Sequence, residues 1–343
     1  MALFDPPPEP STVALKDGFG RSFSYLRLSL TERCNFRCTY CLPHGFANQK
    51  HLPVELSRDE LRRAVQAFAD LGLWKLRLTG GEPTVRTDFI DIVRELSRID
   101  GVRRLAMTTN GYRLKRSAEA WREAGMDAVN VSIDTLDREG FAKITGRDLL
   151  DDVVGGVDEA LATGFDAVKV NSVLLRDLGM SQLHEVLAFV SDRDVSWRFI
   201  ELMRTNDNRE LHAHQATPGE TVRERLFASG WTQVPHLDNR GLGSDGPAVE
   251  YSHPEFRGRI GLIAPYSPGF CSSCNRLRLS SRGKLHLCLF GAEGLDLRDL
   301  LQDDNQRQEL SHRIRSAMPS KAVSHRLDSG DSGGTPHLAS IGG

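Results

Sequence analysis

The sequence predicts an α/β fold built on a parallel sheet, followed by a smaller C-terminal region. Strand-like segments alternate with amphipathic, helix-like segments through the first two thirds of the chain, which is typical of repeated βα units. A chain of 343 residues is long enough for one large barrel-type domain with an appendage, or for two domains. Six βα units in succession imply a sheet that is either doubly wound or curled into an incomplete barrel.

The predicted strands are six short apolar segments. They cover residues 25–30, 76–79, 104–108, 128–133, 167–173 and 197–202. The stretches between them have helical periodicity. Ser57 and Glu60 have the spacing of a capping box at the start of the first helix, and Gly72, Gly125 and Gly164 stand where C-cap glycines belong. These signals predict helices between the strands, as a parallel sheet requires.

The pattern changes near residue 240 to a run punctuated by Gly and Pro. It has strand signals at 249–251 and 259–263 and a short helix near 296–301. We expect four parts: a mobile start over residues 1–12, the βα unit over 13–239, a second region over 240–319 and a flexible tail over 320–343 that ends in Gly-Gly. The tail is rich in Ser and Gly, a composition that leaves a segment mobile unless something holds it.

Composition excludes several classes of protein. The chain has 44 basic and 46 acidic residues and a net charge of −2, which argues against a non-specific nucleic-acid binder. No stretch approaches the roughly 18 apolar residues that a membrane span needs, and the start of the chain lacks the features of a secretory signal. We therefore expect a cytoplasmic protein with no membrane and no nucleic-acid partner. No P-loop motif occurs, so a bound nucleotide would be held in another way.

All six cysteines fall into two groups of three. Such a number is too small for a disulfide scaffold, and closely spaced thiols in a reducing compartment indicate metal or redox chemistry. The two groups therefore predict two metal centres. The first group is Cys34, Cys38 and Cys41, and the second group is Cys271, Cys274 and Cys288.

The first group has Cys-x3-Cys-x2-Cys spacing, so three thiolates can converge from one loop. Three thiolates leave one iron of a [4Fe–4S] cluster without a protein ligand, and that iron can then bind something else. This is the arrangement that a catalytic cluster needs. The alternative is a zinc site completed by His44 or His51.

The second group leaves two kinds of metal site open. Its spacing, with His286 two residues before Cys288, suits a Cys3His zinc knuckle as well as an iron–sulfur centre. Arg276 and Arg278 follow Cys274 closely, although a structural zinc knuckle has no need of two guanidinium groups. An anionic ligand at this centre would explain them.

Polar or small residues follow every predicted strand, and in parallel barrels the chemistry gathers at the C-terminal ends of the strands. The first strand leads into the first cysteine group, and the second leads into Gly80 and Gly81, which permit a close backbone approach to a ligand. The other ends carry residues 108–111, Ser132 and Asp134, Asn171, and residues 201–203. Six such ends in series predict a site at this edge of the sheet.

Basic residues inside the predicted strands indicate the charge of that site. A solvated face is a poor explanation for Arg27, Arg77 and Lys169 if the sheet is covered on both faces. We expect them to point into the barrel. Together with Arg276 and Arg278 they would suit a polyphosphate.

The motif CNFRCTYC followed by GGEP resembles the radical S-adenosylmethionine (SAM) superfamily. With RLTGGEPTVR, TTNG, NVSID, RFIELM, FCSSCNRLRLSS and the closing Ile-Gly-Gly, essentially the whole chain resembles the GTP 3′,8-cyclase family within it. The resemblance implies a partial (β/α)6 TIM-type barrel with a C-terminal region that binds a second iron–sulfur cluster. It implies two [4Fe–4S] clusters, one on each cysteine group, with SAM on the open iron of the first and the purine of GTP on the second.

The resemblance also implies roles for single residues. Those that match the family's SAM-binding positions are Tyr40, Gly81, Ser132 and Met203. Those that match its GTP-binding positions are Arg27, Arg77, Thr108, Lys169, Arg276 and Arg278. Gly342 and Gly343 resemble the end of a tail that enters the active site and is needed for activity.

The implied activity is that of a lyase, which converts GTP to (8S)-3′,8-cyclo-7,8-dihydroguanosine 5′-triphosphate in the first step of molybdenum cofactor (molybdopterin) biosynthesis. A 5′-deoxyadenosyl radical removes the ribose 3′ hydrogen, and the 3′ carbon radical attacks guanine C8. The implied partners are an electron donor such as flavodoxin, or dithionite in vitro, a second copy of the chain in a homodimer, and cyclic pyranopterin monophosphate synthase downstream.

Two other functions remain open from the sequence. One is a different radical SAM enzyme with an auxiliary iron–sulfur cluster, such as a peptide-modifying enzyme. The other is a non-catalytic binding protein that is stabilised by two zinc ions.

Overall fold

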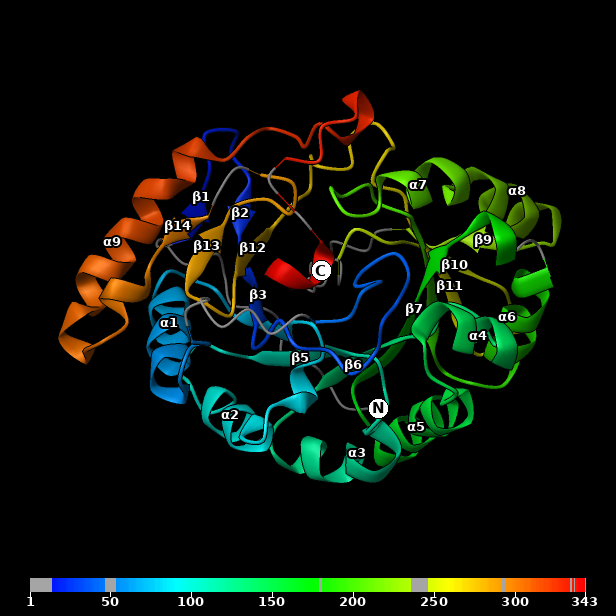
Figure 1. Cartoon of the computed structure of the whole chain (residues 1–343), viewed down its shortest axis with the longest axis horizontal. Helices are drawn as coiled ribbons and strands as arrows, with labels where there is room; N and C mark the ends of the chain where they lie inside the picture. Colours follow the sequence, from blue (N-terminus) through cyan, green and yellow to red (C-terminus); the bar gives the residue numbers. More distant parts are fainter. Residues whose placement is uncertain are drawn as a thin grey trace.

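The computed structural model describes residues 14–46, 54–178, 181–235, 246–291, 294–333, 335 and 337–342. Within these residues the chain forms a curved 12-stranded sheet and a separate two-stranded hairpin. The strands surround the centre of the molecule and the helices lie outside them (Figure 1). The order of the strands in the sheet is β14-β13-β12-β3-β4-β5-β6-β7-β8-β11-β10-β9. Among the described residues the two end strands, β14 and β9, do not pair with each other, so the barrel is incomplete.

The strands of the barrel are β3 (Tyr25–Ser29), β4 (Lys75–Thr79), β5 (Arg104–Thr109), β6 (Ala128–Ser132), β7 (Ala167–Leu174) and β8 (Ser196–Glu201). These are the six predicted strands, and each pairs in parallel with the next along the chain. The parallel sheet contains two more strands than the sequence predicted. β12 (Arg276–Leu279) pairs in parallel with β3, and β11 (Arg259–Ile263) pairs in parallel with β8.

The remaining strands are short and antiparallel. The N-terminal hairpin consists of β1 (Leu15–Lys16) and β2 (Ser22–Phe23). One end of the large sheet is formed by β13 (Lys284–His286) and β14 (Leu295–Asp296), and the other end by β10 (Val249–Ser252) and β9 (Thr232–Gln233). The predicted start over residues 1–12 and the predicted boundary at residues 239 and 240 lie outside the described residues.

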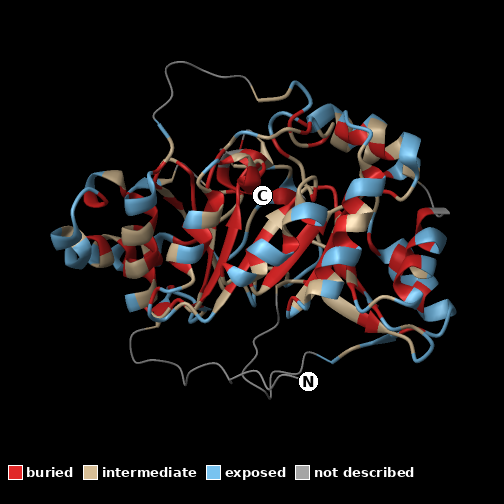
Figure 2. Cartoon of the chain, turned by 90° about the horizontal axis from the view of Figure 1, so that it is seen from below, coloured by how far each residue is buried: buried red, intermediate tan, exposed pale blue. Residues whose placement is uncertain are grey.

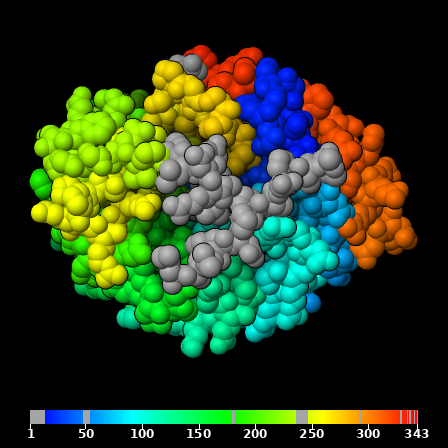
Figure 3. Space-filling model, turned by 180° about the vertical axis from the view of Figure 1, so that it is seen from behind, coloured from blue at the N-terminus to red at the C-terminus, as the bar shows by residue number. Residues whose placement is uncertain are grey.

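The helices cover the outside of the barrel. They are α1 (Arg58–Asp70), α2 (Phe89–Leu96), α3 (Leu114–Glu123), α4 (Arg138–Thr145), α5 (Leu150–Thr163), α6 (Ser181–Ser191), α7 (Arg209–Gln215), α8 (Glu220–Ala228) and α9 (Arg307–Ala317). Ser57 and Glu60 form the predicted capping box at α1. Helices α4, α7 and α9 were not predicted, and the helix expected near 296–301 is a single 3-10 turn at Arg298–Leu300. Helix α9 packs on α1, and Figure 3 shows the two side by side.

Side chains point alternately to the two faces of each strand, so the sheet has an apolar face toward the helices and a polar face toward the barrel interior. Leu26 and Leu28 of β3 are fully buried in the apolar core, so Arg27 between them faces the other side of the sheet, toward the barrel interior. Figure 2 shows this layering, with buried strands inside and exposed outer faces on the helices. Among the described residues, every helix is too short or too polar to cross a lipid bilayer.

Candidate active site

A single cavity brings the two cysteine groups together. It runs along the inside of the barrel, from the C-terminal ends of the strands toward their N-terminal ends, and all six cysteines line it as free thiols. The two groups are far apart in the sequence, and they reach the cavity from opposite ends of the same pair of parallel strands: Cys271 and Cys274 come directly before β12, and Cys34 follows β3. Sheet pairing between the two ends of the chain therefore creates the site.

The loop that carries the first cysteine group follows β3 and is bound to the barrel through its backbone. The amide of Leu30 donates to the carbonyl of Thr79 at 2.9 Å, and the amide of Arg37 donates to the carbonyl of Thr145 at 2.9 Å. Burial raises the pKa of the Cys34 thiol to about 11 and that of the Cys41 thiol to about 12. Thiolates in this loop therefore need a cationic partner, and a bound iron cluster would supply one.

Gly80 and Gly81 allow two backbones to pack closely. The amide of Gly81 donates to the carbonyl of Thr31 at 2.8 Å. A Cβ atom on Gly81 would lie 2.4 Å from the carbonyl oxygen of Arg33, and one on Gly80 would lie 2.3 Å from that of Thr31. The sequence predicted a close approach to a ligand, and what the structure shows is a close approach to the chain itself, at the loop leading to Cys34.

Glu82 links this segment to the loop after β5. Its buried carboxylate accepts hydrogen bonds from Oγ1 of Thr84 at 2.6 Å, Oγ1 of Thr109 at 2.9 Å and the amide of Asn110 at 2.7 Å. Burial raises the pKa of Glu82, although these bonds act in the opposite direction. The side chain of Asn110 in turn donates to Oδ1 of Asn35 at 2.9 Å. Glu82 therefore stabilises the loop beside Cys34 through hydrogen bonds.

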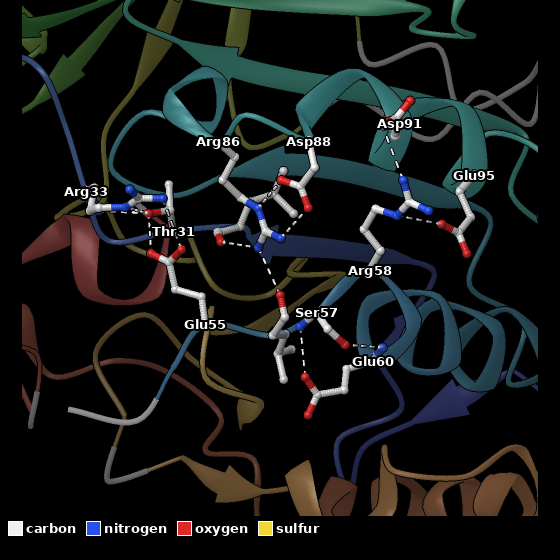
Figure 4. Close-up of polar contacts among 12 residues, drawn as sticks. Thr31, Arg33, Glu55, Ser57, Arg58, Glu60, Arg86, Asp88, Asp91 and Glu95 are labelled. Carbon is white, nitrogen blue, oxygen red and sulfur yellow. Dashed lines mark hydrogen bonds and ion pairs between the residues drawn. The ribbon is translucent and has the colours of Figure 1, made fainter. Parts of the chain in front are cut away.

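Arg86 also stabilises the segment that leads to the first cysteine group, as Figure 4 shows. Its Nη1 donates to the carbonyl of Leu30 at 3.1 Å and to that of Leu56 at 2.9 Å, and its other nitrogens bind the carboxylate of Asp88 at 2.8 and 2.9 Å. Arg86 is buried. It therefore fixes the end of β3 against the segment that leads into α1.

The four residues matched to SAM binding, Tyr40, Gly81, Ser132 and Met203, all line the cavity. Tyr40 donates its hydroxyl proton to Oδ2 of Asp134 at 2.8 Å. Burial raises the pKa of Asp134 to about 6, against hydrogen bonds from Tyr40 and the amide of Val173. The Asn208 side chain donates to the carbonyls of Tyr40 at 3.2 Å and of Met203 at 3.0 Å. Asn208 therefore holds these two residues in one place.

Three arginines form a row across neighbouring strands. Arg278 of β12 is opposite Arg27 of β3, which is opposite Arg77 of β4. All three line the cavity, as does Arg276. Burial lowers the pKa of Arg27 to about 10, and the charges of Arg77 and Arg276 add to this effect. Arg77 and Arg278 are buried and Arg27 is half-buried. A row of guanidinium groups in the wall of one cavity is a site for a highly charged anion.

Tyr25 lies within this row. It is opposite Arg276 on one side and Lys75 on the other, and its hydroxyl oxygen accepts a hydrogen bond from Nε of Arg77. Burial alone would raise the pKa of Tyr25, but the charges of Arg77, Arg27 and Lys75 outweigh it and lower the pKa to about 7. The positive potential is therefore strong enough to favour a buried tyrosinate.

Three polar side chains complete the wall beside the arginines. Thr108, Asn130 and Asn171 line the cavity, and Oγ1 of Thr108 and Oδ1 of both asparagines are buried with no hydrogen-bond partner among the described residues. Such atoms are available to bind polar groups of a ligand. Lys169, which the sequence placed in the same site, is buried on β7 opposite Asn130 but does not line the cavity.

The second cysteine group lies in a different electrostatic setting from the first. Burial would raise the pKa of Cys271, but hydrogen bonds from His325 and Ser324 outweigh it and lower the pKa to about 6. The pKa of Cys274 is also lowered against burial, by the charges of Arg276 and Lys321. Thiolates are therefore stabilised here by the protein itself.

The zinc site that the sequence left open at the second cysteine group depends on His286 as its fourth ligand. His286 does not line the cavity, and burial together with Arg278 and Lys284 lowers its pKa to about 4. Among the described residues, no three His, Cys, Asp or Glu side chains are arranged to hold one metal ion. His51 lies outside the described residues.

The end of the chain lies inside the barrel. The 3-10 helix η8 (Leu338–Ile341) lies over the centre of the ring of strands in Figure 1, and Leu338 and Ala339 line the cavity. Arg278 donates from Nη1 to the carbonyl of Gly342. Composition predicted a tail that is mobile unless something holds it, and these contacts show what holds it. Gly343 lies outside the described residues.

Several residues that line the cavity were not assigned to it from the sequence. Arg198 of β8 is buried and forms an ion pair with Glu250 at 2.6 Å. It carries the same signal as Arg27, a charge inside a strand, and could have been found in that way. Phe270 and His325 also line the cavity, and nothing in the sequence around them indicated it.

Known proteins resemble this chain in sequence and in fold. Residues 28–190 match the radical SAM superfamily, and residues 195–327 match Molybdenum Cofactor Synthesis C. GTP 3′,8-cyclase of Aeromonas hydrophila is 51% identical over 333 residues, which are 96% of each chain. GTP 3′,8-cyclase of Vibrio cholerae is 49% identical over 329 residues, 96% of this chain and 97% of the relative. That of Haemophilus influenzae is 48% identical over 96% of each chain.

The fold resembles solved structures at much lower identity. Streptococcus suis SuiB bound to S-adenosylmethionine has a TM-score of 0.57 at 15% identity, covering 86% of this chain and 68% of that one. Native anSMEcpe with bound AdoMet and a Cp18Cys peptide has a TM-score of 0.52 at 15% identity, covering 83% and 82%. These likenesses confirm the partial barrel. The sequence matches are stronger, and they show that the chain belongs to the GTP 3′,8-cyclase family of the radical SAM superfamily.

Proposed function

We propose that this chain converts GTP to (8S)-3′,8-cyclo-7,8-dihydroguanosine 5′-triphosphate, the first step of molybdenum cofactor biosynthesis. One observation carries the proposal: two groups of three cysteines line the same cavity, with a row of arginines in its wall. The relatives named GTP 3′,8-cyclase, at about half identity over 96% of the chain, support the assignment.

Each cysteine group would hold a [4Fe–4S] cluster through three thiolates. When bound, the reduced first cluster and SAM would supply a 5′-deoxyadenosyl radical that takes the 3′ hydrogen of the GTP ribose; the 3′ carbon would then join guanine C8, and one further electron from the reductant with one proton would complete the product. The cluster and SAM carry the radical chemistry, and the protein binds and orients SAM and GTP and shields them from water. Cys34, Cys38 and Cys41 would hold the first cluster, and the second cysteine group would hold the cluster that binds the purine.

Tyr40, Gly81, Ser132 and Met203 would surround SAM. Hydrogen bonds from Tyr40 to Asp134 and from Asn208 to the carbonyls of Tyr40 and Met203 support this placement, because they keep the SAM wall rigid. A rigid wall matters because a small displacement of the reacting atoms slows a hydrogen transfer.

The arginine row would bind the triphosphate. Arg27, Arg77, Arg276 and Arg278 contribute the charge, and Thr108 offers a buried hydroxyl that has no hydrogen-bond partner among the described residues. Lys169 is buried on β7, two strands beyond Thr108 of β5 and opposite Asn130 of β6. We place it as a further contributor to the positive potential, which long-range charge supplies without contact.

The chain terminus would close the site. Gly342 and Gly343 end the segment whose residues Leu338 and Ala339 line the cavity. An apolar turn in this position keeps water away from a radical. We further propose a cytoplasmic homodimer that receives electrons from a protein such as flavodoxin and passes its product to cyclic pyranopterin monophosphate synthase.

The test uses iron-loaded protein under anaerobic conditions with SAM and dithionite. Formation of 5′-deoxyadenosine is followed with GTP, with ATP and without nucleotide. A GTP-specific rise, together with a cyclised product, supports the cyclase. Cleavage that is indifferent to GTP contradicts the cyclase and leaves a different radical SAM enzyme, such as a peptide-modifying one. No cleavage by protein with iron at both sites contradicts both.

A further inference from the structure

Arg21 joins three parts of the chain that lie far apart in the sequence. It stands next to β2 in the N-terminal hairpin, and its side chain is only 9% exposed. Nη1 donates to the carbonyl of Cys271 at 2.9 Å and to that of Val323 at 2.7 Å, while Nη2 donates to the carbonyl of Ala322 at 2.7 Å. One planar guanidinium therefore binds the second cysteine loop and the start of the C-terminal tail at the same time.

Asp17 fixes the direction of this guanidinium. Its Oδ2 accepts from Nε of Arg21 at 2.6 Å, and its Oδ1 accepts from the amides of Phe19 at 2.9 Å and Arg21 at 3.0 Å. Because Asp17 balances the charge through Nε, the terminal nitrogens of Arg21 are directed at carbonyl oxygens. The hairpin therefore holds Arg21 in one orientation.

Lys321 holds the same stretch of tail from another side. It is buried, its Nζ donates to the carbonyl of Leu287, and it lies 5.1 Å from the ring centre of Phe23 in the hairpin. Leu287 is adjacent to Cys288 in the chain. Residues 321–323 are therefore fixed between the hairpin and both parts of the second cysteine group.

The tail beyond Arg21 reaches the wall of the cavity. His325 lines the cavity, and its ring centre is 5.9 Å from that of Phe270 and 5.8 Å from that of Phe290. Its Nδ1 accepts the amide proton of Leu327 at 3.3 Å, which places the proton of the neutral ring on Nε2. Because His325 follows Val323 so closely, any shift of the carbonyls that Arg21 binds moves this ring relative to Cys271.

We propose that Arg21 is a positioning residue that couples docking of the C-terminal tail to the geometry of the second cysteine group. The proposal rests on the proposed function, in which that group holds the nucleotide-binding cluster and the tail completes the site. Arg21 is not part of the cavity wall that the structure describes. It therefore acts through the backbone of Cys271 and of residues 322–323, and not by touching SAM or GTP.

Arg21→Lys tests the coupling in the full-length, iron-loaded chain. Lysine keeps the charge and can pair with Asp17, but a single ammonium cannot reproduce the fork that binds three carbonyls. The first readout is the rate at which trypsin releases the peptide that follows Arg326. The second is the change that GTP causes in the electron paramagnetic resonance (EPR) spectrum of the reduced protein without SAM. Arg307→Lys is the matched control, because Arg307 also binds a carboxylate through two nitrogens, at Asp70 on the outer surface.

In Arg21→Lys we expect the iron content to be unchanged and trypsin to release the tail peptide faster by about tenfold or more. We also expect GTP to change the EPR spectrum in a different way from the parent chain. Arg307→Lys should behave as the parent chain in both readouts. Where the parent chain responds to GTP, parental behaviour of Arg21→Lys in both readouts, or a change in only one, overturns the coupling. The protease readout needs no nucleotide, so it tests Arg21 even where a parent chain that ignores GTP has refuted the proposed function. If Arg21→Lys loses iron, Asp17→Asn takes its place, because it releases the orientation of Arg21 and keeps the guanidinium.

Discussion

Arg278 donates a hydrogen bond from Nη1 to the backbone carbonyl of Gly342. This guanidinium also belongs to the row that it forms with Arg27 and Arg77. Burial, with the charges of Arg27 and Arg276, holds the pKa of Arg278 well below its usual value. A carbonyl oxygen orients Arg278 without neutralising it, so the positive charge of the row stays available to an anion while the chain terminus is fixed beside it.

Gly342→Ala is expected to impair cyclisation while both clusters remain. Gly342 has a φ of +69°, and a Cβ atom there would lie 2.4 Å from Cγ2 of Thr79. The substitution combines about 1 to 2 kcal/mol of backbone strain with a clash, so the turn at the terminus should leave the cavity. We expect the rate of product formation to fall by about tenfold or more. Product is measured by chromatography and iron by chemical assay.

Gly164→Ala is the matched control for that substitution. Gly164 has a φ of +79°, but a Cβ atom there would meet nothing within 4 Å. It therefore carries the strain without the clash, at the end of α5 and away from the cavity. Equal losses of activity in the two variants would show that strain alone matters and that the position of the terminus does not.

Cys38→Ser and Cys274→Ser should separate the roles of the two cysteine groups. The first change removes a ligand of the SAM-binding cluster, so it should abolish formation of 5′-deoxyadenosine. The second should allow slow SAM cleavage but remove its dependence on GTP. Anaerobic assays with dithionite measure both. SAM cleavage that survives in Cys38→Ser would refute the assignment of the first cluster.

Arg77→Met should weaken GTP binding and spare SAM cleavage in the absence of nucleotide. A charge-assisted hydrogen bond to phosphate contributes about 1.5 to 3 kcal/mol, so we expect KM for GTP to rise by roughly 10- to 100-fold. Arg116→Met, which removes an exposed arginine of α3, is the control for the change in net charge. An unchanged KM in Arg77→Met would place the triphosphate elsewhere.

Tyr25 should ionise well below the usual range of a tyrosine. Burial opposes ionisation, but Arg77, Arg27 and Lys75 lower the pKa from 10.0 to about 7. Because the pKa is lower in the folded chain, Tyr25 stabilises the fold fully above the unfolded pKa, and this contribution is lost as the pH falls through about 7. The difference in ultraviolet absorbance between the parent chain and Tyr25→Phe, followed against pH, measures this ionisation.

Binding of GTP should then raise the pKa of Tyr25. The negative charge of a triphosphate beside Arg27 and Arg77 disfavours a second anion in the row. The titration is repeated with GTP and, as a control, with guanosine, which lacks the charge. An identical titration in both would show that the triphosphate does not occupy the arginine row.

The barrel could be predicted from the sequence because its signals are local. Six apolar segments, the capping box at Ser57 and the C-cap glycines each depend on neighbouring residues, and the structure has all six strands in the predicted order. The pairing of β12 with β3 could not be predicted, because it joins residues from opposite ends of the chain. That pairing aligns Arg278 with Arg27 and creates the shared cavity.

The candidate site could be predicted where residue type alone was informative. Cysteine spacing and charges within strands identified both cysteine groups and most of the arginine row. Residues that depend on long-range contacts were missed, including Arg21, which binds Cys271 and the tail through backbone carbonyls. Backbone carbonyls have no signature in the sequence. For Lys169 the sequence was informative only in part. Its place in a strand correctly indicated that it is buried, but it did not indicate that Lys169 would stay outside the lining of the cavity.

The most direct test of the account follows one hydrogen atom. GTP carrying deuterium at the ribose 3′ position is incubated with iron-loaded protein, SAM and dithionite under anaerobic conditions, and the 5′-deoxyadenosine is analysed by mass spectrometry. The account predicts that deuterium appears in 5′-deoxyadenosine in step with loss of GTP. Formation of 5′-deoxyadenosine without deuterium, while GTP stays intact, would contradict it.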